Sequence, residues 1–143
     1  MIDNNSPKQG LRVIGRRGHP EVRGCFIRFA TWLRKEYRFP VRLNVYLSPR
    51  RFIIARDGDE CVGTLWVPDS KNEYPYIRIA TGDYEDRQKQ EGRNNALAAD
   101  IQLLCHLVIH YWQWLDKNDM WDRGVNRRAT KILRRYEQTT VDP

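Results

Sequence analysis

Two histidines lie four residues apart in the most apolar helical stretch of the chain, at His106 and His110. In a helix this spacing places both imidazoles on one face, one turn apart, where they can bind the same metal ion. The residue directly after the first histidine is Leu107, whose side chain cannot accept a proton. The pair therefore predicts a metal site without an adjacent catalytic carboxylate, although this spacing also arises by coincidence on partly exposed helices.

The pair matches two of the three fixed positions of H-E-x-x-H, a signature of zinc peptidases. In that signature the glutamate takes a proton from the metal-bound water and passes it to the leaving amine. Leu107 occupies the place of this glutamate. Loss of such a base should slow the reaction by at least ~10²–10⁴-fold. The motif therefore favours a metal-binding scaffold over an ordinary hydrolase.

The elements that position the histidines follow from periodicity. Residues 1–18 are polar and basic and predict an N-terminal arm that becomes ordered near Leu11–Ile14, and we expect one domain over 19–143. A helix begins at His19-Pro20 and is stopped by Pro40. Four short strands separated by turn residues are predicted at 41–47, 51–55, 61–67 and 74–80. We expect an α+β fold with a small, mainly antiparallel sheet of three or four strands.

Two further helices follow the sheet. The longer one is predicted over 95–117, and residues 86–94 are either a loop or its first turn. Its apolar face carries Leu97, Ile101, Leu104, Val108, Tyr111, Trp112 and Leu115, and its opposite face carries Gln102, His106, His110, Gln113 and Lys117. A C-terminal helix is predicted over 123–138. The histidines therefore point toward a semi-polar surface, away from the main apolar stripe.

Charge and cysteine content narrow the classes of function. Residues 1–60 contain 13 Lys and Arg against 6 Asp and Glu, whereas residues 61–143 contain 12 of each, so the net charge of +7 comes from the N-terminal part. Such an excess indicates an acidic partner or simply a well-solvated surface.

The three cysteines are far apart in the sequence, which indicates free thiols. Together with the absence of a signal peptide or membrane span, they indicate a cytoplasmic protein. No glycine-rich phosphate loop is present.

The order of these elements resembles that of the minimal zincin-like metallopeptidases, such as the SprT-type and ImmA/IrrE-type peptidases. The run His-Leu-Val-Ile-His-Tyr-Trp-Gln-Trp at residues 106–114 resembles the H-E-x-x-H-Y-x-Q-W form of small bacterial proteins of this kind. The segment 122–129 is similar to their C-terminal helix, and the strand 76–80 would be the sheet edge that runs beside a substrate. The resemblance covers residues 20–138 as an architecture and 103–136 as a motif.

The resemblance implies a zinc ion and a third ligand on the following helix. In gluzincin-like members this ligand is a glutamate, and Asp122 is the acidic residue nearest to that place. Asp122 would alternatively serve as an N-cap, and a shifted alignment puts Gly124 at the ligand position, leaving only two protein ligands. His19 is expected to be a cap or surface residue, with a role as third ligand as the weaker alternative.

Arginine clusters provide the candidate partner-binding residues, and interleaved Tyr37, Phe39 and Tyr46 would offer stacking surfaces for nucleic acid. The arginines are Arg12, Arg16, Arg17, Arg23, Arg50, Arg51, Arg127, Arg128, Arg134 and Arg135. These side chains would otherwise serve solubility and ion pairing within helices. No helix-turn-helix, RNP or zinc-finger motif indicates a named mode of nucleic-acid binding.

Two functions remain open at this point. In the first, the chain is a degenerate zincin-like scaffold that binds or regulates an acidic protein or nucleoprotein, for example as an inhibitor of a bacterial or phage complex that handles nucleic acid. In the second, it is an active zinc peptidase in which Glu85 or Asp83, at the end of the presumed edge strand, supplies the base. The first is favoured because leucine at position 107 cannot accept a proton and so cannot act as the general base.

Overall fold

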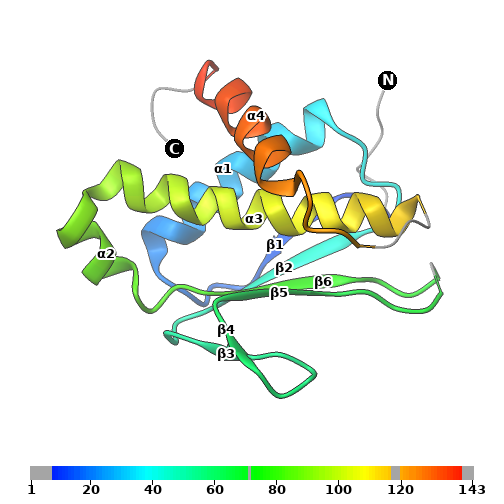
Figure 1. The fold of residues 1–143 in the computed structure, drawn as a ribbon, viewed down its shortest axis with the longest axis horizontal. Coiled ribbons are helices and arrows are strands. Elements are labelled where there is room, and N and C mark those ends of the chain that lie inside the picture. Colours follow the sequence, from blue (N-terminus) through cyan, green and yellow to red (C-terminus); the bar gives the residue numbers. More distant parts are fainter. Residues whose placement is uncertain (1–7, 71, 117–119, 140–143) are drawn as a thin grey trace.

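The computed structural model describes residues 8–70, 72–116 and 120–139. The helices are α1 (Pro20–Glu36), α2 (Tyr84–Glu91), α3 (Arg93–Leu115) and α4 (Val125–Glu137). The strands are β1 (Leu11–Ile14), β2 (Leu43–Ser48), β3 (Ile53–Ile54), β4 (Glu60–Cys61), β5 (Gly63–Trp66) and β6 (Tyr76–Ala80). The predicted α+β class is confirmed. Figure 1 shows α1, α3 and α4 on one side of the main sheet and the β3–β4 hairpin on the other.

The main sheet is mixed, with the strand order β1-β2-β6-β5. β1 pairs with β2 and β2 with β6 in parallel, and only β5 runs antiparallel to its neighbour β6. The prediction of a mainly antiparallel sheet was therefore wrong. Turn residues between strands indicate where the chain reverses, but they do not indicate which strands pair. Here α1 is the crossover that makes β1 and β2 parallel.

Part of the segment predicted as a basic arm belongs to the sheet. Leu11–Ile14 pairs with residues 43–46 of β2, and the side chain of Leu11 is fully buried. The domain therefore extends N-terminal to the predicted boundary at residue 19. Residues 1–7 lie outside the described part of the chain.

The strand Tyr76–Ala80 is not the sheet edge. β6 lies between β2 and β5, so the edge strand beside the histidine-bearing helix is β5. A Cβ atom added to Gly63 of β5 would lie 3.1 Å from a Leu103 methyl group and 3.2 Å from a Leu107 methyl group. The absence of a side chain at Gly63 thus allows β5 to pack closely against α3.

The core lies between the sheet and the helices. Alternate residues of β2 and β6 turn toward α1 and α3, and the side chains of Leu43, Val45, Leu47, Ile77 and Ile79 are buried. The apolar face of α3 packs in the same core, as its periodicity predicts. The helix ends at Leu115, and Lys117 lies outside the described residues. α3 therefore forms a rigid, buried support for the residues on its remaining face.

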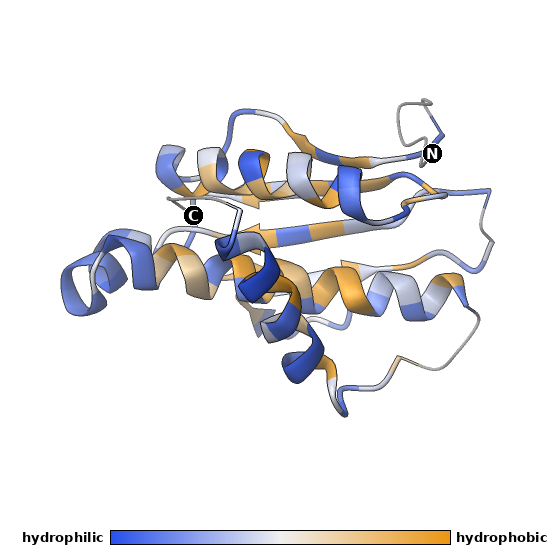
Figure 2. Ribbon diagram, turned by 90° about the horizontal axis from the view of Figure 1, so that it is seen from above, coloured by the Kyte–Doolittle hydropathy of each residue, from blue (hydrophilic) through white to orange (hydrophobic). Residues whose placement is uncertain are grey.

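The polar segment before α3 is a helix of its own. α2 covers Tyr84–Glu91 and stops at Gly92, whose φ of 88° is in the left-handed region that favours glycine. Figure 2 shows this short helix almost entirely in the hydrophilic colour, whereas the middle of α3 is largely in the hydrophobic colour. Residues 86–94 were predicted to be a loop or the first turn of the long helix. In the structure, residues 86–91 belong to the separate helix α2, Gly92 separates the two helices, and α3 begins at Arg93.

Candidate metal site

The two histidines of α3 are brought into direct contact by the pitch of the helix. Their Nε2 atoms lie 3.1 Å apart and their ring centroids 4.8 Å apart. His110 is nearly buried, with 9% of its surface exposed, and His106 is half-buried. Both rings face the segment that leads into α4, because the opposite face of α3 is packed in the core. The predicted face for the pair is thus confirmed.

Asp122 completes the group from the segment before α4. Its Oδ1 atom lies 3.0 Å from Nε2 of His110 and 3.4 Å from Nε2 of His106. The N-cap of α4 is Gly124, with φ at 77°, and no side chain caps that helix. The alternative role of Asp122 as an N-cap is therefore wrong. Gly124, the other residue considered for the ligand position, has no ligand atom in its side chain.

The spacing of the three atoms is within about 0.4 Å of that in one face of a tetrahedral metal site. The triangle formed by the two Nε2 atoms and Oδ1 has sides of 3.0, 3.1 and 3.4 Å. Ligands at the usual zinc bond lengths of 2.0–2.1 Å lie about 3.3–3.4 Å apart when the angle at the metal is tetrahedral. His106, His110 and Asp122 could therefore hold a metal ion, and they form the group of this kind found among the described residues.

The hydrogen bonds of the ring Nδ1 atoms favour metal binding by Nε2. Nδ1 of His110 lies 2.7 Å from Oε1 of Gln113. The amide of Gln113 is oriented by the backbone of Trp121, because its Nε2 donates to the Trp121 carbonyl and its Oε1 accepts from the Trp121 amide. Oε1 is thus an acceptor, and Nδ1 of His110 must donate. This tautomer leaves the lone pair of His110 Nε2 directed at the metal position.

His106 has an equivalent partner on α4. Its Nδ1 atom lies 2.9 Å from Oδ1 of Asn126. When Nδ1 donates this bond, both Nε2 atoms and the Asp122 carboxylate present only lone pairs to one another. Three converging acceptors repel each other unless a cation lies between them. The chemistry of the ligand set therefore fits a divalent metal.

Leu107 is buried against the edge strand β5. Its side chain is 8% exposed and packs with Leu103 against Gly63 on β5. The residue that follows His106 is thus an apolar side chain packed between α3 and β5. No other acidic residue joins His106, His110 and Asp122 in the described part of the chain.

The two acids considered as substitute bases are engaged elsewhere. Asp83 pairs with Arg87 of α2, which also binds Asp100. Glu85 lies 3.4 Å from Nε2 of His19. Both acids belong to the end of the molecule around α2, at the far end of α3 from His110 (Figure 1). They give no support to the hypothesis of an active peptidase with a substitute base.

His19 and two of the cysteines, Cys25 and Cys105, have structural environments. Nδ1 of His19 accepts a hydrogen bond from the Glu21 amide and caps α1, as expected. All three cysteines are free, and burial raises the pKa of the Cys25 and Cys105 thiols to about 12. Such thiols are neither reactive nor suited to metal binding at neutral pH.

The predicted arginines are spread over several surfaces. Arg12 lies on β1, Arg16 and Arg17 in the loop after it, and Arg23 on α1, while Arg50 and Arg51 follow β2 and Arg127, Arg128, Arg134 and Arg135 lie on α4. Some of them have partners within the protein. Arg51 pairs with Asp86, Arg128 lies over the ring of Trp112, and Arg135 contacts Tyr37.

One of the three predicted stacking residues, Phe39, is excluded by its burial. Phe39 is fully buried against Tyr111, and Tyr37 packs between Trp32 and Trp112. Tyr46 is 38% exposed and remains available. The sequence reasoning also missed the role of Gln113 and Asn126 as partners of the histidines. The i, i+3 spacing of His110 and Gln113 could have indicated the first, whereas Asn126 is brought in only by the tertiary fold.

None of the described helices is both long enough and apolar enough to span a membrane.

Comparison of the chain with protein-family models, with curated proteins and with solved structures gives no match. The interpretation of the site therefore depends on its own geometry.

Proposed function

We propose that this chain is a zincin-like domain that holds zinc at His106, His110 and Asp122, lacks peptidase activity, and acts as a binding or regulatory protein for an acidic protein or nucleoprotein. The observation that carries the zinc site is the triangle of ligand atoms with sides of 3.0–3.4 Å. Gln113 and Asn126 support it by binding the other nitrogen of each imidazole.

Leu107 is the basis for the absence of peptidase activity. Zinc with an open coordination position supplies a Lewis acid and lowers the pKa of bound water to ≈ 7. Hydrolysis of a peptide also requires a group that accepts a proton and returns it to the leaving amine. Leu107 has no such atom, and its side chain is buried against β5. The protein's own residues thus bind and orient a metal but provide no proton transfer.

The metal content of the purified protein tests the site. We expect near-stoichiometric zinc by elemental mass spectrometry in the wild type and its loss in His106→Ala/His110→Ala. His19→Asn is the matched control, because it removes the remaining histidine of the chain while keeping an acceptor at the N-cap of α1. Absence of metal in the wild type after incubation with zinc, or equal zinc in all three proteins, would contradict the proposed site.

A peptidase assay tests the second part of the proposal. The zinc-loaded wild type should not cleave an unfolded protein substrate, whereas Leu107→Glu is the variant in which activity should appear, with Leu107→Gln as its isosteric control. Zinc-dependent cleavage by the wild type that disappears in His106→Ala would establish the alternative, an active peptidase with a different base.

A further inference from the structure

One face of the main sheet is not covered by helices in the described part of the chain. The side chains of β2 and β6 that alternate with the buried ones turn away from α1 and α3, to the side where only the β3–β4 hairpin lies (Figure 1). The register of the four strands places the side chains of this outer face in rows. Arg12, Asn44, Tyr76 and Trp66 form one row across it, and Ile14, Tyr46, Arg78 and Thr64 form the next.

Three aromatic rings from adjacent strands lie in contact on this outer face. The ring centroids of Trp66 and Tyr76 are 5.3 Å apart, and those of Tyr76 and Tyr46 are 6.0 Å apart. Trp66 and Tyr76 are partly exposed and Tyr46 is exposed. Aromatic side chains usually turn inward, since burying a ring stabilises the fold. A line of three rings on the uncovered side therefore indicates a surface that binds flat, stacking groups.

Cations surround the rings. The guanidinium of Arg56 lies 4.3 Å from the centroid of Trp66, and Arg42 reaches Asn44 on the same face of β2. A cavity of about 700 Å³ continues the face toward the carboxyl ends of the parallel strands and is lined by Tyr46 together with Arg17, Arg50 and Arg78. Glu60 also lines this cavity. None of the four strands of the sheet contains an aspartate or a glutamate.

We propose that this outer face binds single-stranded nucleic acid, with unpaired bases stacked on Trp66, Tyr76 and Tyr46 and phosphates bound by the surrounding arginines. Every base has a π-face, and stacking on aromatic side chains is available only to unpaired bases. The inference names the partner of the binding role proposed above and depends on that role, but it uses no residue of the metal site.

Other occupants fit the outer face less well. An acidic peptide would pair with the arginines but would leave the line of three rings without flat groups to stack on. A second copy of this chain would bring one basic face against another, so like charges would repel. Double-stranded nucleic acid offers phosphates but keeps its base faces inside the helix.

Fluorescence anisotropy with labelled oligo(dT) and oligo(rU) of about 12 nucleotides tests the proposal. We expect saturable binding, with Trp66→Ala and Tyr76→Ala each raising Kd at least about tenfold. Trp66→Phe and Tyr76→Phe keep a ring at each position and should bind within about threefold of the wild type. Since all four variants change partly exposed residues, circular dichroism and a thermal melt establish that each is folded.

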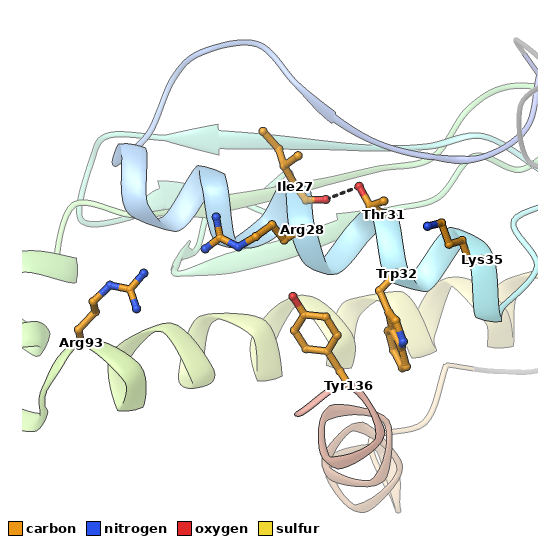
Figure 3. A pocket seen from close by; sticks show the side chains of 7 residues that line it. All are labelled: Ile27, Arg28, Thr31, Trp32, Lys35, Arg93 and Tyr136. Atoms are coloured by element: carbon orange, nitrogen blue, oxygen red, sulfur yellow. Dashed lines mark hydrogen bonds between the residues drawn. The ribbon is translucent and has the colours of Figure 1, made fainter. Parts of the chain in front are cut away.

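A charge control comes from a second basic pocket on the other side of the molecule. This pocket lies between α1 and α4, and Figure 3 shows Arg28, Lys35 and Arg93 around the rings of Trp32 and Tyr136. Arg28→Gln/Lys35→Gln removes the same charge as Arg17→Gln/Arg56→Gln. Only the second pair, on the outer face, should weaken binding and reduce the salt dependence, by about 0.7 in log Kd per log salt for each lost phosphate contact.

Several results would overturn the proposal. The first is the absence of oligonucleotide binding at low salt, and the second is wild-type affinity in both alanine variants. The third is an equal loss of affinity in the two double variants. The proposal would also fail if the protein bound duplex DNA as tightly as oligo(dT), or if it bound polyglutamate but no oligonucleotide. The metal-free His106→Ala/His110→Ala protein should bind the oligonucleotide like the wild type. If zinc is stoichiometric and no oligonucleotide binds, this inference fails and the metal site stands. If oligonucleotide binds and the wild type cleaves substrate, the proposed loss of peptidase activity fails instead.

Discussion

Gln113 orients His110 and is not one of the three residues that could hold a metal ion. Its Oε1 accepts from Nδ1 of His110 at 2.7 Å, and both polar atoms of its amide are held by the backbone of Trp121. Residues of this kind usually contribute 10–100-fold to metal affinity, because they fix the tautomer and the direction of the ring. We therefore expect the zinc affinity of the proposed site to depend on Gln113 as well as on the three candidate ligands.

Replacement of Gln113 tests this role. Gln113→Ala should weaken zinc binding about 10–100-fold, measured by competition with a chelator. Gln102→Ala is the matched control, because Gln102 lies on the same face of α3 but donates to the backbone carbonyl of Asn126 and to the side-chain hydroxyl of Thr130. Equal affinities for Gln113→Ala and the wild type would show that the tautomer of His110 does not depend on Gln113.

Asp100 is a carboxyl group that the fold keeps nearly out of water. Burial raises its pKa from the ordinary value of 3.8 to about 6, and Arg87, which donates to Oδ1 at 2.6 Å, only partly opposes this. Its Oδ2 atom has no hydrogen-bond partner among the described residues. Between these two pKa values the folded state binds the proton more tightly than the unfolded chain does.

The stability of the protein should therefore fall as the pH rises from about 4 to about 6, as far as Asp100 contributes. The asparagine in Asp100→Asn does not titrate. The free energy of unfolding of the wild type minus that of Asp100→Asn should therefore decrease across the same pH window. Urea denaturation at several pH values, with chelator present, measures the difference. Subtraction of the variant is needed because the pKa of Glu21 is lowered, mainly by the hydrogen bond from Tyr84, and this shift acts in the opposite direction. A constant difference would contradict the burial of an ionisable Asp100.

Two glycines, Gly82 and Gly24, differ in how closely neighbouring elements approach them. A Cβ atom at Gly82, between β6 and α2, would lie 2.5–2.6 Å from the backbone of residues 49–51. A Cβ atom at Gly24, within α1, would meet only the end of the Arg28 side chain, at 3.3 Å. The first neighbour is a fixed backbone, and the second is a flexible side chain that can move aside.

Alanine at these two positions should have opposite effects. Gly82→Ala should lower the free energy of unfolding by about 1–3 kcal/mol, because the loop after β2 must shift. Gly24→Ala should leave stability unchanged or raise it by up to about 1 kcal/mol, since alanine is the better helix former. Chemical denaturation of both variants beside the wild type provides the comparison, and a neutral Gly82→Ala would contradict the close contact between residue 82 and the β2–β3 loop.

The elements themselves were largely predictable from local pattern. Helical periodicity located α1, α3 and α4 to within a few residues, and alternation located β2 and β6. The strand predicted over 61–67 is divided, with Cys61 in β4 and Gly63 in β5, so the chain leaves one sheet and enters another at Val62. Pattern within one strand contains no information about its partner, and this is why the parallel pairings and the inner place of β6 were not foreseen.

The candidate site was predictable only in part for the same reason. His106 and His110 are neighbours through helical geometry, which the sequence contains. The approach of Asp122 and Asn126 depends on how α4 docks against α3, and that depends on packing between distant residues. At the level of the whole molecule, the excess of arginine was evident, but its division between α4 and the outer face of the sheet was not.

The parallel pairing of β1 with β2 has a consequence for how the chain can be shortened. β1, together with Gly10 before it, satisfies the edge of β2 that does not face β6, through pairing along Leu43–Tyr46 and the hydrogen bond from the Leu43 amide to the Gly10 carbonyl. A truncation made after residue 14, which the polar and basic composition of this segment invites, would leave β2 with a row of unpaired amide and carbonyl groups. Such an edge recruits strands from other molecules. We therefore expect β1 to protect the chain from aggregation.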